Sequence, residues 1–466
     1  MIRNHTKKMK YNKNRKPILD TKTAKQKTSK TIHKNKYKIK YNIKNKYKHK
    51  NNNYIATLIN LYYNNDQVAN NFLNYKDTKQ HIFPEHNRII VIGDIHGDLD
   101  VIIECLTLSN CIEKIIVPDS KDVLSMDTFF KSLKWIGKDT YVVQLGDQID
   151  RVRPQNWDDN EVTLDNAYKD EGSTLEILYL FYYLDKLARN YNGRVFSIIG
   201  NHEIMNVEGD FRYVSLKEFK SFKEHLESIY HINSKFPYHS RTLKQNSLKL
   251  LRNNIQSNTD SKLPKGYRER LYAFSPTGLC ANMLGYNNYT MLQIGKWLFC
   301  HGSPVFKTVN TYSIDMINNF VSMYLNGIDN HKDSVDDDDG SQVAMNYYKI
   351  VKHGNSSVIW NRDFGETELL NHTEIKLTKQ LNTILDAYNN KNSILQKNNN
   401  AQPANCIAIG HTIQDINKHG INSICNGRVW RCDVAMSKAF GDNKVSKHRK
   451  PQVLEILNDH TTKVLR

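Results

Sequence analysis

The chain has 466 residues, of which 39% are hydrophobic, and this is enough for one large domain or two modest ones. No apolar run approaches the ~20 residues of a bilayer-spanning helix, and no signal-peptide core follows the basic start, so we expect neither a membrane-spanning nor a secreted protein. Seven cysteines without a Cys-x-x-Cys pair fit a reducing compartment, which indicates a soluble intracellular protein, either cytoplasmic or nuclear.

The excess positive charge is confined to the amino terminus. Residues 1–50 carry 19 Lys and Arg against one acidic residue, Asp20, and this excess equals the net charge of +18 of the whole chain. Residues 1–53 have few apolar residues and no helical or strand period, which predicts a disordered Lys- and Asn-rich arm. The arm is either a tether for nucleic acid, an acidic partner or an anionic membrane, or a nuclear address, or else a solvated segment without a dedicated role.

Strands and helices alternate after the arm. Apolar residues at helical spacing predict a helix over residues 54–74, within a leading segment 54–87. Three predicted strands are apolar and end directly at a Gly-Asp or Gly-Asn step: residues 88–92, 140–145 and 194–199. Two predicted helices follow the first two of these strands: residues 98–108 and 173–188. This alternation predicts an α/β core.

The second half of the chain contains two polar insertions. Residues 215–265, with a helical pattern from Leu216, indicate a subdomain or cap, and residues 312–357 form the second insertion. A Lys- and Asn-rich low-complexity stretch occupies residues 389–400. The remaining apolar runs predict strands: residues 291–295, 296–300, 406–409, 429–434 and 453–457. We therefore expect one catalytic domain over residues 88–466.

The strand ends carry residue types that bind divalent cations. The carboxyl ends of successive strands gather at one edge of a sheet, so ligands placed there can hold two ions. Asp94 and His96 lie two residues apart on a turn and can face one ion, while Asp147 can bridge both. The second ion would be completed by residues that each follow a strand: Asn201, His301 and His411.

These residues suit phosphoester hydrolysis. Two divalent ions ~3.5–4 Å apart lower the pKa of a bridging water, which attacks the phosphorus atom. His202, next to Asn201 but itself unligated, can protonate the leaving alkoxide, and Asp150 can orient that imidazole. Arg151 can clamp the phosphate with two hydrogen bonds.

Three blocks resemble the signature of the calcineurin-like metallophosphoesterases, in the version found in phosphoprotein phosphatases. They are Gly-Asp-Ile-His-Gly at 93–97, Gly-Asp-Gln-Ile-Asp-Arg at 146–151 and Gly-Asn-His-Glu at 200–203. Further blocks resemble the Shewanella-like branch of that family: residues 200–214, Trp360-Asn361-Arg362, 409–414 and 429–433. The resemblance covers roughly residues 88–457 with insertions. It departs from the family at Val152 and Ser303, which stand where Gly is usual, and neither replaces a ligand.

The resemblance implies a four-layer αββα sandwich with two ions, commonly manganese, or iron with zinc. It implies the following ligands for the first ion: Asp94, His96 and Asp147. It implies the following ligands for the second ion: Asp147, Asn201, His301 and His411. His202 with Asp150 would form the acid pair, and Arg151 with Arg362 the phosphate clamp.

Three functions are compatible with the sequence. The first is a protein serine/threonine phosphatase acting on phosphoproteins, favoured by the Asp150-Arg151 and Asn-His-Glu pattern, with tyrosine left open. The second is a small-molecule phosphoesterase of the same fold, such as a dinucleoside polyphosphate hydrolase, because the insertions would narrow the cleft. The third is a non-catalytic nucleic-acid-binding protein that uses the basic arm.

Overall fold

The structure is a computed structural model whose described part excludes the predicted amino-terminal arm. It describes residues 54–62, 79–116, 123–153, 170–226, 264–327, 342–352, 354, 357–366, 371–414, 420–440 and 450–466. The arm predicted over residues 1–53 therefore lies outside the described residues, as do the centres of both predicted insertions.

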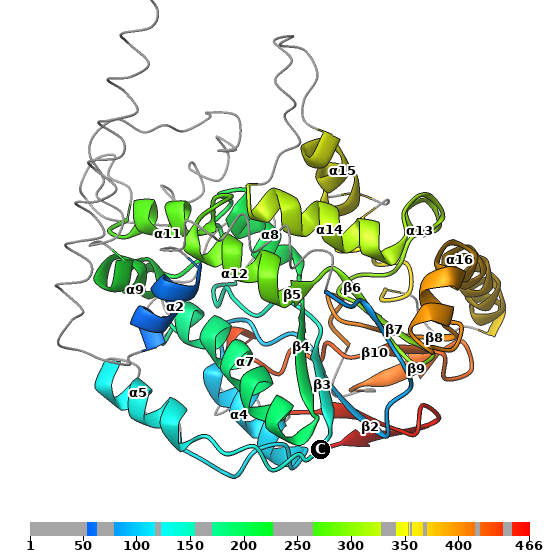
Figure 1. Ribbon diagram of the computed structural model, residues 1–466, viewed down its shortest axis with the longest axis horizontal. Coiled ribbons are helices and arrows are strands. Elements are labelled where there is room, and N and C mark those ends of the chain that lie inside the picture. Colours follow the sequence, from blue (N-terminus) through cyan, green and yellow to red (C-terminus); the bar gives the residue numbers. More distant parts are fainter. Residues whose placement is uncertain are drawn as a thin grey trace, which may run out of the picture. The chain divides into compact units, whose positions relative to one another are not determined.

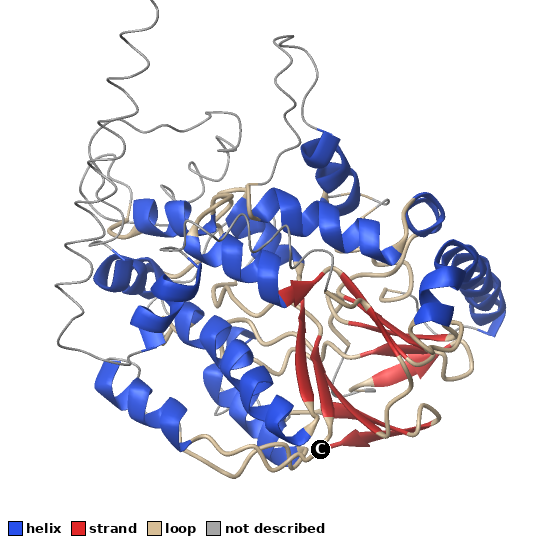
Figure 2. Ribbon diagram, viewed as in Figure 1, coloured by secondary structure: helices blue, strands red, loops and turns tan. Residues whose placement is uncertain are grey.

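Twelve described strands form two six-stranded sheets (Figures 1 and 2). The first sheet has the order β12-β11-β2-β3-β4-β5 and the second β1-β6-β7-β8-β10-β9. The strands of the first sheet are β2 Arg88–Ile92, β3 Tyr141–Gln144, β4 Arg194–Ile198, β5 Asn288–Tyr289, β11 Val453–Leu457 and β12 Thr461–Leu465. Those of the second are β1 Ile82–Phe83, β6 Met291–Ile294, β7 Trp297–Cys300, β8 Cys406–Ile409, β9 Asn422–Ile424 and β10 Val429–Arg431.

Each sheet has a parallel centre. Strands β2, β3 and β4 are parallel neighbours in the first sheet, and β7, β8 and β10 are parallel neighbours in the second. Strands β2, β3, β7 and β8 are almost wholly apolar and buried, as expected where both faces of a sheet are covered. Parallel strands present their carboxyl ends at one edge, so six loops become available to build one site.

Helices cover the sheets. In the figures α4 and α7 lie on the outer side of the first sheet, and α16 lies beside the second. The Tyr388 hydroxyl of α16 donates to Gln293 of β6 over 2.8 Å, which ties that helix to its sheet. This is the predicted four-layer αββα arrangement, and the predicted α/β class is confirmed.

The described helices have the following bounds: α2 Tyr54–Tyr62, α4 Leu99–Leu108, α5 Val123–Ser132, α7 Thr174–Ala188, α8 Asn201–Val207, α9 Leu216–Leu226, α11 Tyr267–Phe274, α12 Leu279–Asn287, α13 Phe306–Thr311, α14 Ile314–Leu325, α15 Gln342–Val351 and α16 Asn371–Asn398. Two short 3₁₀ helices are η1 Arg189–Tyr191 and η2 Lys438–Phe440. No helix in this described set has both the length and the apolar character needed to cross a bilayer.

The predicted strands are confirmed to within a few residues, whereas the helices are only partly anticipated. The helix expected over 54–74 is described only as α2, because residues 63–78 lie outside the described part. The low-complexity stretch 389–400 lies mostly within α16, where buried Tyr388, Asn392 and Gln396 recur at four-residue spacing. Helical periodicity is present there, although the many Asn residues mask it in the composition.

The second predicted insertion, residues 312–357, contributes α14 and α15. Asn318 of α14 is buried beside the start of β6 and makes four hydrogen bonds with its amide. Its oxygen accepts from the Thr290 and Met291 amides at 2.7 and 3.4 Å, and its nitrogen donates to the Met291 and Ile314 carbonyls at 2.9 and 2.8 Å. Asn318 therefore joins this insertion to the second sheet by three hydrogen bonds at the start of β6.

Asn318→Ala should lower the free energy of unfolding by about 1–3 kcal/mol, because it leaves buried backbone groups without partners. Urea unfolding followed by circular dichroism measures the change. The control is Asn319→Ala at the next position, which is partly exposed and should stay within about 0.5 kcal/mol of the wild type. Equal losses in both variants would contradict the anchoring role.

Candidate active site

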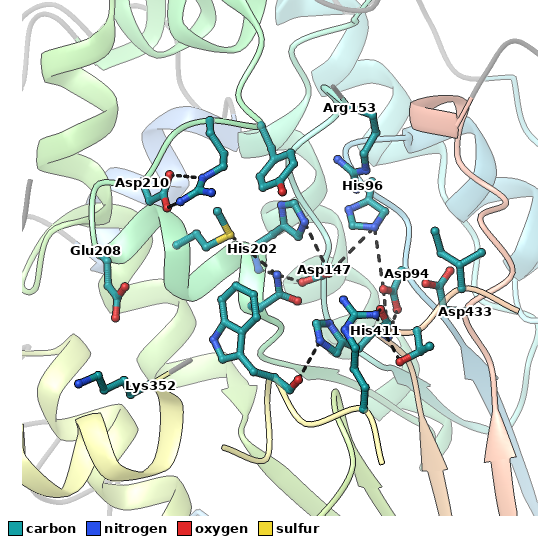
Figure 3. A pocket seen from close by; sticks show the side chains of 18 of the residues that line it. Asp94, His96, Asp147, Arg153, His202, Glu208, Asp210, Lys352, His411 and Asp433 are labelled. Carbon is teal, nitrogen blue, oxygen red and sulfur yellow. Dashed lines mark hydrogen bonds and ion pairs between the residues drawn. The ribbon is translucent and has the colours of Figure 1, made fainter. Parts of the chain in front are cut away.

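The loops that follow the parallel strands of both sheets meet at one cavity of about 1230 Å³ (Figure 3). Seven of the predicted site residues line the cavity: Asp94, His96, Asp147, Asn201, His202, Arg362 and His411. His301, which follows β7, is fully buried next to Asp147 and Asn201. The structure thus brings all six predicted metal ligands together from both sheets.

Asp147 lies at the centre of this cluster. Its carboxylate oxygens lie 3.3 Å from His301 Nε2, 4.0 Å from His96 Nε2 and 3.8 Å from His202 Nε2. Two groups with the spacing of metal-ion ligands share it: His96, Asp147 and His202, and Asp147, His301 and His411. A carboxylate common to two such groups is in the position that a bridging ligand needs.

Backbone carbonyls orient the three predicted imidazole ligands. His301 Nδ1 lies 2.8 Å from the Leu145 carbonyl, and His96 Nδ1 lies 3.4 Å from that of Ile149. His411 uses its other nitrogen, Nε2, which lies 3.2 Å from the Trp360 carbonyl. A ring nitrogen that donates to a carbonyl leaves the opposite nitrogen unprotonated, and this is the usual arrangement around a ligating histidine.

The carboxylates of the site repel one another. Burial, followed by the nearby charges of Asp433 and Asp147, raises the pKa of Asp94 well above its usual value. Burial also raises the pKa of Asp433 to about 6, with Asp147 acting in the same direction. Burial alone would raise the pKa of Asp147, but the surrounding histidines outweigh it and hold that pKa well below the usual range. The cluster therefore has excess negative charge that a bound cation would neutralise.

The protonation of the site histidines also suits the binding of a divalent cation. Burial lowers the pKa of His96 and of His411 well below the usual value, which keeps their ring nitrogens available as ligands. For His301 burial acts in the same direction, but Asp147 and two hydrogen bonds outweigh it and raise the pKa. The His301 ring therefore lies where positive charge is stabilised. Carboxylates, neutral imidazoles and one amide are a donor set that fits divalent ions.

Two glycines allow the loops to approach one another. A Cβ atom on Gly200 would lie 2.3 Å from the backbone nitrogen of Asp147, and one on Gly410 would lie 2.4 Å from a carboxylate oxygen of Asp94. Neither position has room for a side chain. This explains why the strand ends that build the site carry glycine directly before the ligand.

Glu203 connects two of the site loops. Its fully buried carboxylate accepts hydrogen bonds from the backbone amides of Asp147, Gln148 and Gly200 at 3.0, 2.9 and 2.7 Å. Burial raises the pKa of Glu203 to about 8, with Asp147 contributing in the same direction. The Asn-His-Glu block thus supplies both a ligand and the residue that fixes the Asp147 loop against α8.

His202 and Asp150 form the predicted pair. His202 Nδ1 lies 3.0 Å from Asp150, whose carboxylate is fully buried, and Nε2 faces the cavity. Asn206 donates to both oxygens of Asp150 at 3.0 and 2.9 Å, and Arg270 donates to one of them at 3.1 Å. The arrangement can hold a proton on the side of the imidazole that faces the centre.

The two predicted phosphate-binding arginines occupy different positions. Arg362 lines the cavity and donates to the His411 carbonyl over 3.0 Å. Arg151 is buried outside the cavity lining, where it donates to the His96 and Gly97 carbonyls at 3.2 and 2.8 Å and pairs with Glu171 at 2.5 Å. Its guanidinium therefore has partners elsewhere, and its predicted role as phosphate clamp remains a prediction that this geometry does not support.

Arg153 lines the cavity two residues after Arg151 (Figure 3). Its guanidinium carbon lies 4.8 Å from the Phe440 ring and 5.5 Å from the Tyr213 ring, and it donates to the Asp150 and Val152 carbonyls. Arg153 is not among the predicted site residues, because the strand and turn pattern does not show which of the two nearby arginines, Arg151 or Arg153, lines the cavity.

Asp433 was also missed as a site residue, although a signal was present. It follows β10 by two residues, as Asp94 follows β2, and its carboxylate lines the cavity. The Ala435 amide donates to it over 2.9 Å. The rule that site residues follow strand ends, applied to β10, identifies Asp433 as a site residue.

Comparisons with known proteins find a family model and relatives that match this chain. The model of the calcineurin-like phosphoesterase family matches residues 87–415. The chain is 28% identical over 396 residues to Shewanella-like protein phosphatase 2 of Arabidopsis thaliana, covering 82% of this chain and 78% of that protein. It is 32% identical over 156 residues to Shewanella-like protein phosphatase 1 of Plasmodium berghei (strain Anka), covering 33% of this chain and 31% of that protein.

A similar solved structure is that of a cold-active protein tyrosine phosphatase. The TM-score is 0.45 at 19% sequence identity, and the match covers 84% of this chain and 83% of that chain.

Mn²⁺ or Zn²⁺ added to chelator-treated protein should raise the melting temperature by about 5 °C at saturating concentration, because the ions bind only the folded site. Asp147→Asn should lose most of this rise and most of the bound metal, measured by differential scanning fluorimetry and elemental analysis. The matched control is Asp210→Asn, since Asp210 also lines the cavity but pairs with Arg212 at 2.6 Å. An Asp147→Asn protein that retains both the full rise and the metal would contradict the central role of Asp147.

Proposed function

The chain belongs to the calcineurin-like phosphoesterase family, and on that premise we propose that it is a metal-dependent protein serine/threonine phosphatase. The observation that carries the proposal is that Asp147 lies between His96 on one side and His301 and His411 on the other, with His202 of the His202–Asp150 pair next to it. Together these features provide places for two cations and a proton donor within one cavity, as hydrolysis of a phosphate ester requires.

The proposed metal ligands divide as the sequence predicts. Asp94, His96 and Asp147 would hold one ion. The residues that would hold the second are Asp147, Asn201, His301 and His411. Two ions held there, of manganese or of iron and zinc, would supply an activated water and neutralise charge on the phosphoryl oxygens.

The cavity also offers protein groups that bind phosphate. Arg153 and Arg362 both line it, and a guanidinium forms strong charged hydrogen bonds with phosphoryl oxygens. Burial lowers the pKa of Arg153, yet an arginine remains charged at neutral pH, and a phosphate would restore the hydrogen bonds that burial removes. We assign phosphate binding to Arg153 and Arg362 ahead of Arg151.

Proton delivery favours an alkyl phosphate substrate. The alkoxide of serine or threonine is a poor leaving group and departs readily only when it is protonated, whereas the phenolate of tyrosine needs less assistance. His202, held by Asp150, presents Nε2 to the cavity and is suited to provide that proton. The acid pair therefore supports serine and threonine phosphates, and the protein phosphatase names of the relatives support a phosphoprotein substrate.

A small-molecule substrate is the second candidate. Helix α15 of the second predicted insertion forms part of the cavity wall, since Tyr348 lies on it, Lys352 directly follows it, and both residues line the cavity. A walled cavity of this size would also accept a dinucleoside polyphosphate.

The decisive experiment is turnover of a substrate panel by purified, manganese-loaded protein. The panel contains phosphoserine, phosphothreonine and phosphotyrosine peptides and a dinucleoside tetraphosphate. We expect the highest kcat/KM on the phosphoserine or phosphothreonine peptides, and a loss of about 10²–10⁴-fold in kcat for His202→Ala on them. Preference for the tetraphosphate would favour the small-molecule candidate, and preference for phosphotyrosine would reject the serine/threonine assignment.

Arg153→Ala should raise the inhibition constant of inorganic phosphate by about 10-fold or more, because it removes a charged hydrogen bond to the anion. Arg151→Lys is the matched comparison and should change that constant by less than about threefold, since Arg151 contacts backbone carbonyls and Glu171. Competitive inhibition with an aryl phosphate substrate measures both values. A larger effect at Arg151 than at Arg153 would restore the assignment made from the sequence.

A further inference from the structure

A fully buried arginine lies behind the His202–Asp150 pair. Arg270 of α11 has no exposed surface, and its guanidinium donates to four different side chains. The three shorter bonds run from Nη2 to Asp150 over 3.1 Å, from Nε to Asn206 over 2.8 Å and from Nη1 to Glu218 over 3.1 Å, and a longer bond runs from Nη1 to Thr174 over 3.4 Å. One cation therefore connects the loop after β3 with α8 and α9.

The surroundings of this guanidinium make the pairing necessary. Phenylalanine rings lie close to it, with that of Phe222 at 4.8 Å and that of Phe274 at 5.1 Å. A cation among aromatic side chains and away from water requires anionic partners with good hydrogen-bond geometry. Asp150, fully buried, is such a partner, and the fully buried carboxyl group of Glu218 is a further hydrogen-bond acceptor.

The two carboxylates are not equivalent. Burial, followed by the charge of Asp170, raises the pKa of Glu218 to about 8, although Arg270 acts in the opposite direction. Its Oε1 atom is buried without a hydrogen-bond partner among the described residues. A protonated Glu218 leaves the charge of Arg270 to be balanced by Asp150.

Arg270 also acts on Asp150 through Asn206. Because Arg270 donates to the amide oxygen of Asn206, the amide nitrogen must face the other way, where it donates to both oxygens of Asp150 and to the His202 carbonyl. Arg270, Asn206 and Asp150 thus form a closed ring of hydrogen bonds. This ring restricts the Asp150 carboxylate to one orientation, in which its Oδ2 accepts from His202 Nδ1.

We propose that Arg270 is a positioning residue for proton delivery: it fixes the Asp150 carboxylate, which accepts from His202 Nδ1–H and so directs the Nε2–H bond of the doubly protonated ring at the leaving oxygen. The ring gives up its Nε2 proton to that oxygen and keeps the proton on Nδ1. The proposal rests on the proposed function. Arg270 lies just beyond residues 215–265, so α11, which borders the first predicted insertion, supports the acid pair.

The test compares two substrates that differ in their need for a proton. A phosphoserine peptide loses an alkoxide that must be protonated, whereas 2,4-dinitrophenyl phosphate loses a stable anion that needs none. Arg270→Lys keeps the charge but cannot reach all four partners at once. We expect kcat to fall about 30-fold on the peptide and less than about threefold on the aryl phosphate, with KM and bound metal unchanged.

Glu218→Gln is the matched control, because it changes the same buried cluster on the side away from Asp150. Its kcat should stay within about threefold of the wild type on both substrates. An equal loss of kcat on both substrates in Arg270→Lys would overturn the proposal, because it indicates a general structural role. Loss of bound metal in Arg270→Lys, or the same substrate-dependent loss in Glu218→Gln, would also overturn it.

A measurement independent of turnover separates this proposal from the proposed function. Long-range ¹H–¹⁵N spectra of the zinc-loaded protein, with the His202 ring assigned by its absence in His202→Ala, report which ring nitrogen carries the proton. We expect Nδ1 to carry a proton in the wild type both when Nε2 is protonated and after Nε2 has lost its proton, and we expect mixed tautomers of the neutral ring in Arg270→Lys. An unchanged tautomer in Arg270→Lys would reject the role of Arg270. If the wild type hydrolyses neither ester, the proposed function fails, while the tautomer still decides the role of Arg270.

Discussion

Concentrated negative charge at the edge where the two sheets meet is the constraint on which the rest of the structure depends. The carboxylates of Asp94, Asp147 and Asp433 are each at most 2% exposed and come from loops after β2, β3 and β10. Burial, followed by repulsion from Asp433 and Asp147, raises the pKa of Asp94, and the negative charge of the three groups must be balanced locally. Backbone amides and imidazoles provide part of that balance, and the arrangement of the donors leaves places where divalent cations would provide the rest.

Local backbone contacts turn this constraint into a defined geometry. The Glu203 carboxylate accepts hydrogen bonds from three backbone amides and so fixes the loop that carries Asp147. Gly200 has no side chain, which lets α8 approach that loop closely. The His411 amide donates to Asp94, so the first sheet is joined to the second through a ligand itself. Glu203 and Gly200, which lie next to predicted ligands in the sequence, therefore hold the site loops in place.

Elements outside the two sheets decide how the site is used. Arg270 on α11 supports the acid pair from behind, and Tyr348 of α15 and the adjacent Lys352 form part of the cavity wall in front. These helices lie in or beside the predicted insertions. Both the acid pair and the cavity wall are thus contacted by helices outside the two sheets, and we expect the choice of substrate to depend on these helices more than on the metal ligands.

The sequence by itself determined the strands, the α/β class and the six predicted ligand positions that the structure brings together, because these residues lie just after apolar runs and parallel strands gather their carboxyl ends. The tertiary structure decided the surroundings of three residues that no local pattern distinguishes. Arg151 turns toward backbone carbonyls while Arg153 enters the cavity, and Arg270 reaches Asp150 from a helix 120 positions away. Side-chain direction and contacts between distant segments depend on packing, which periodicity and spacing along the chain do not encode.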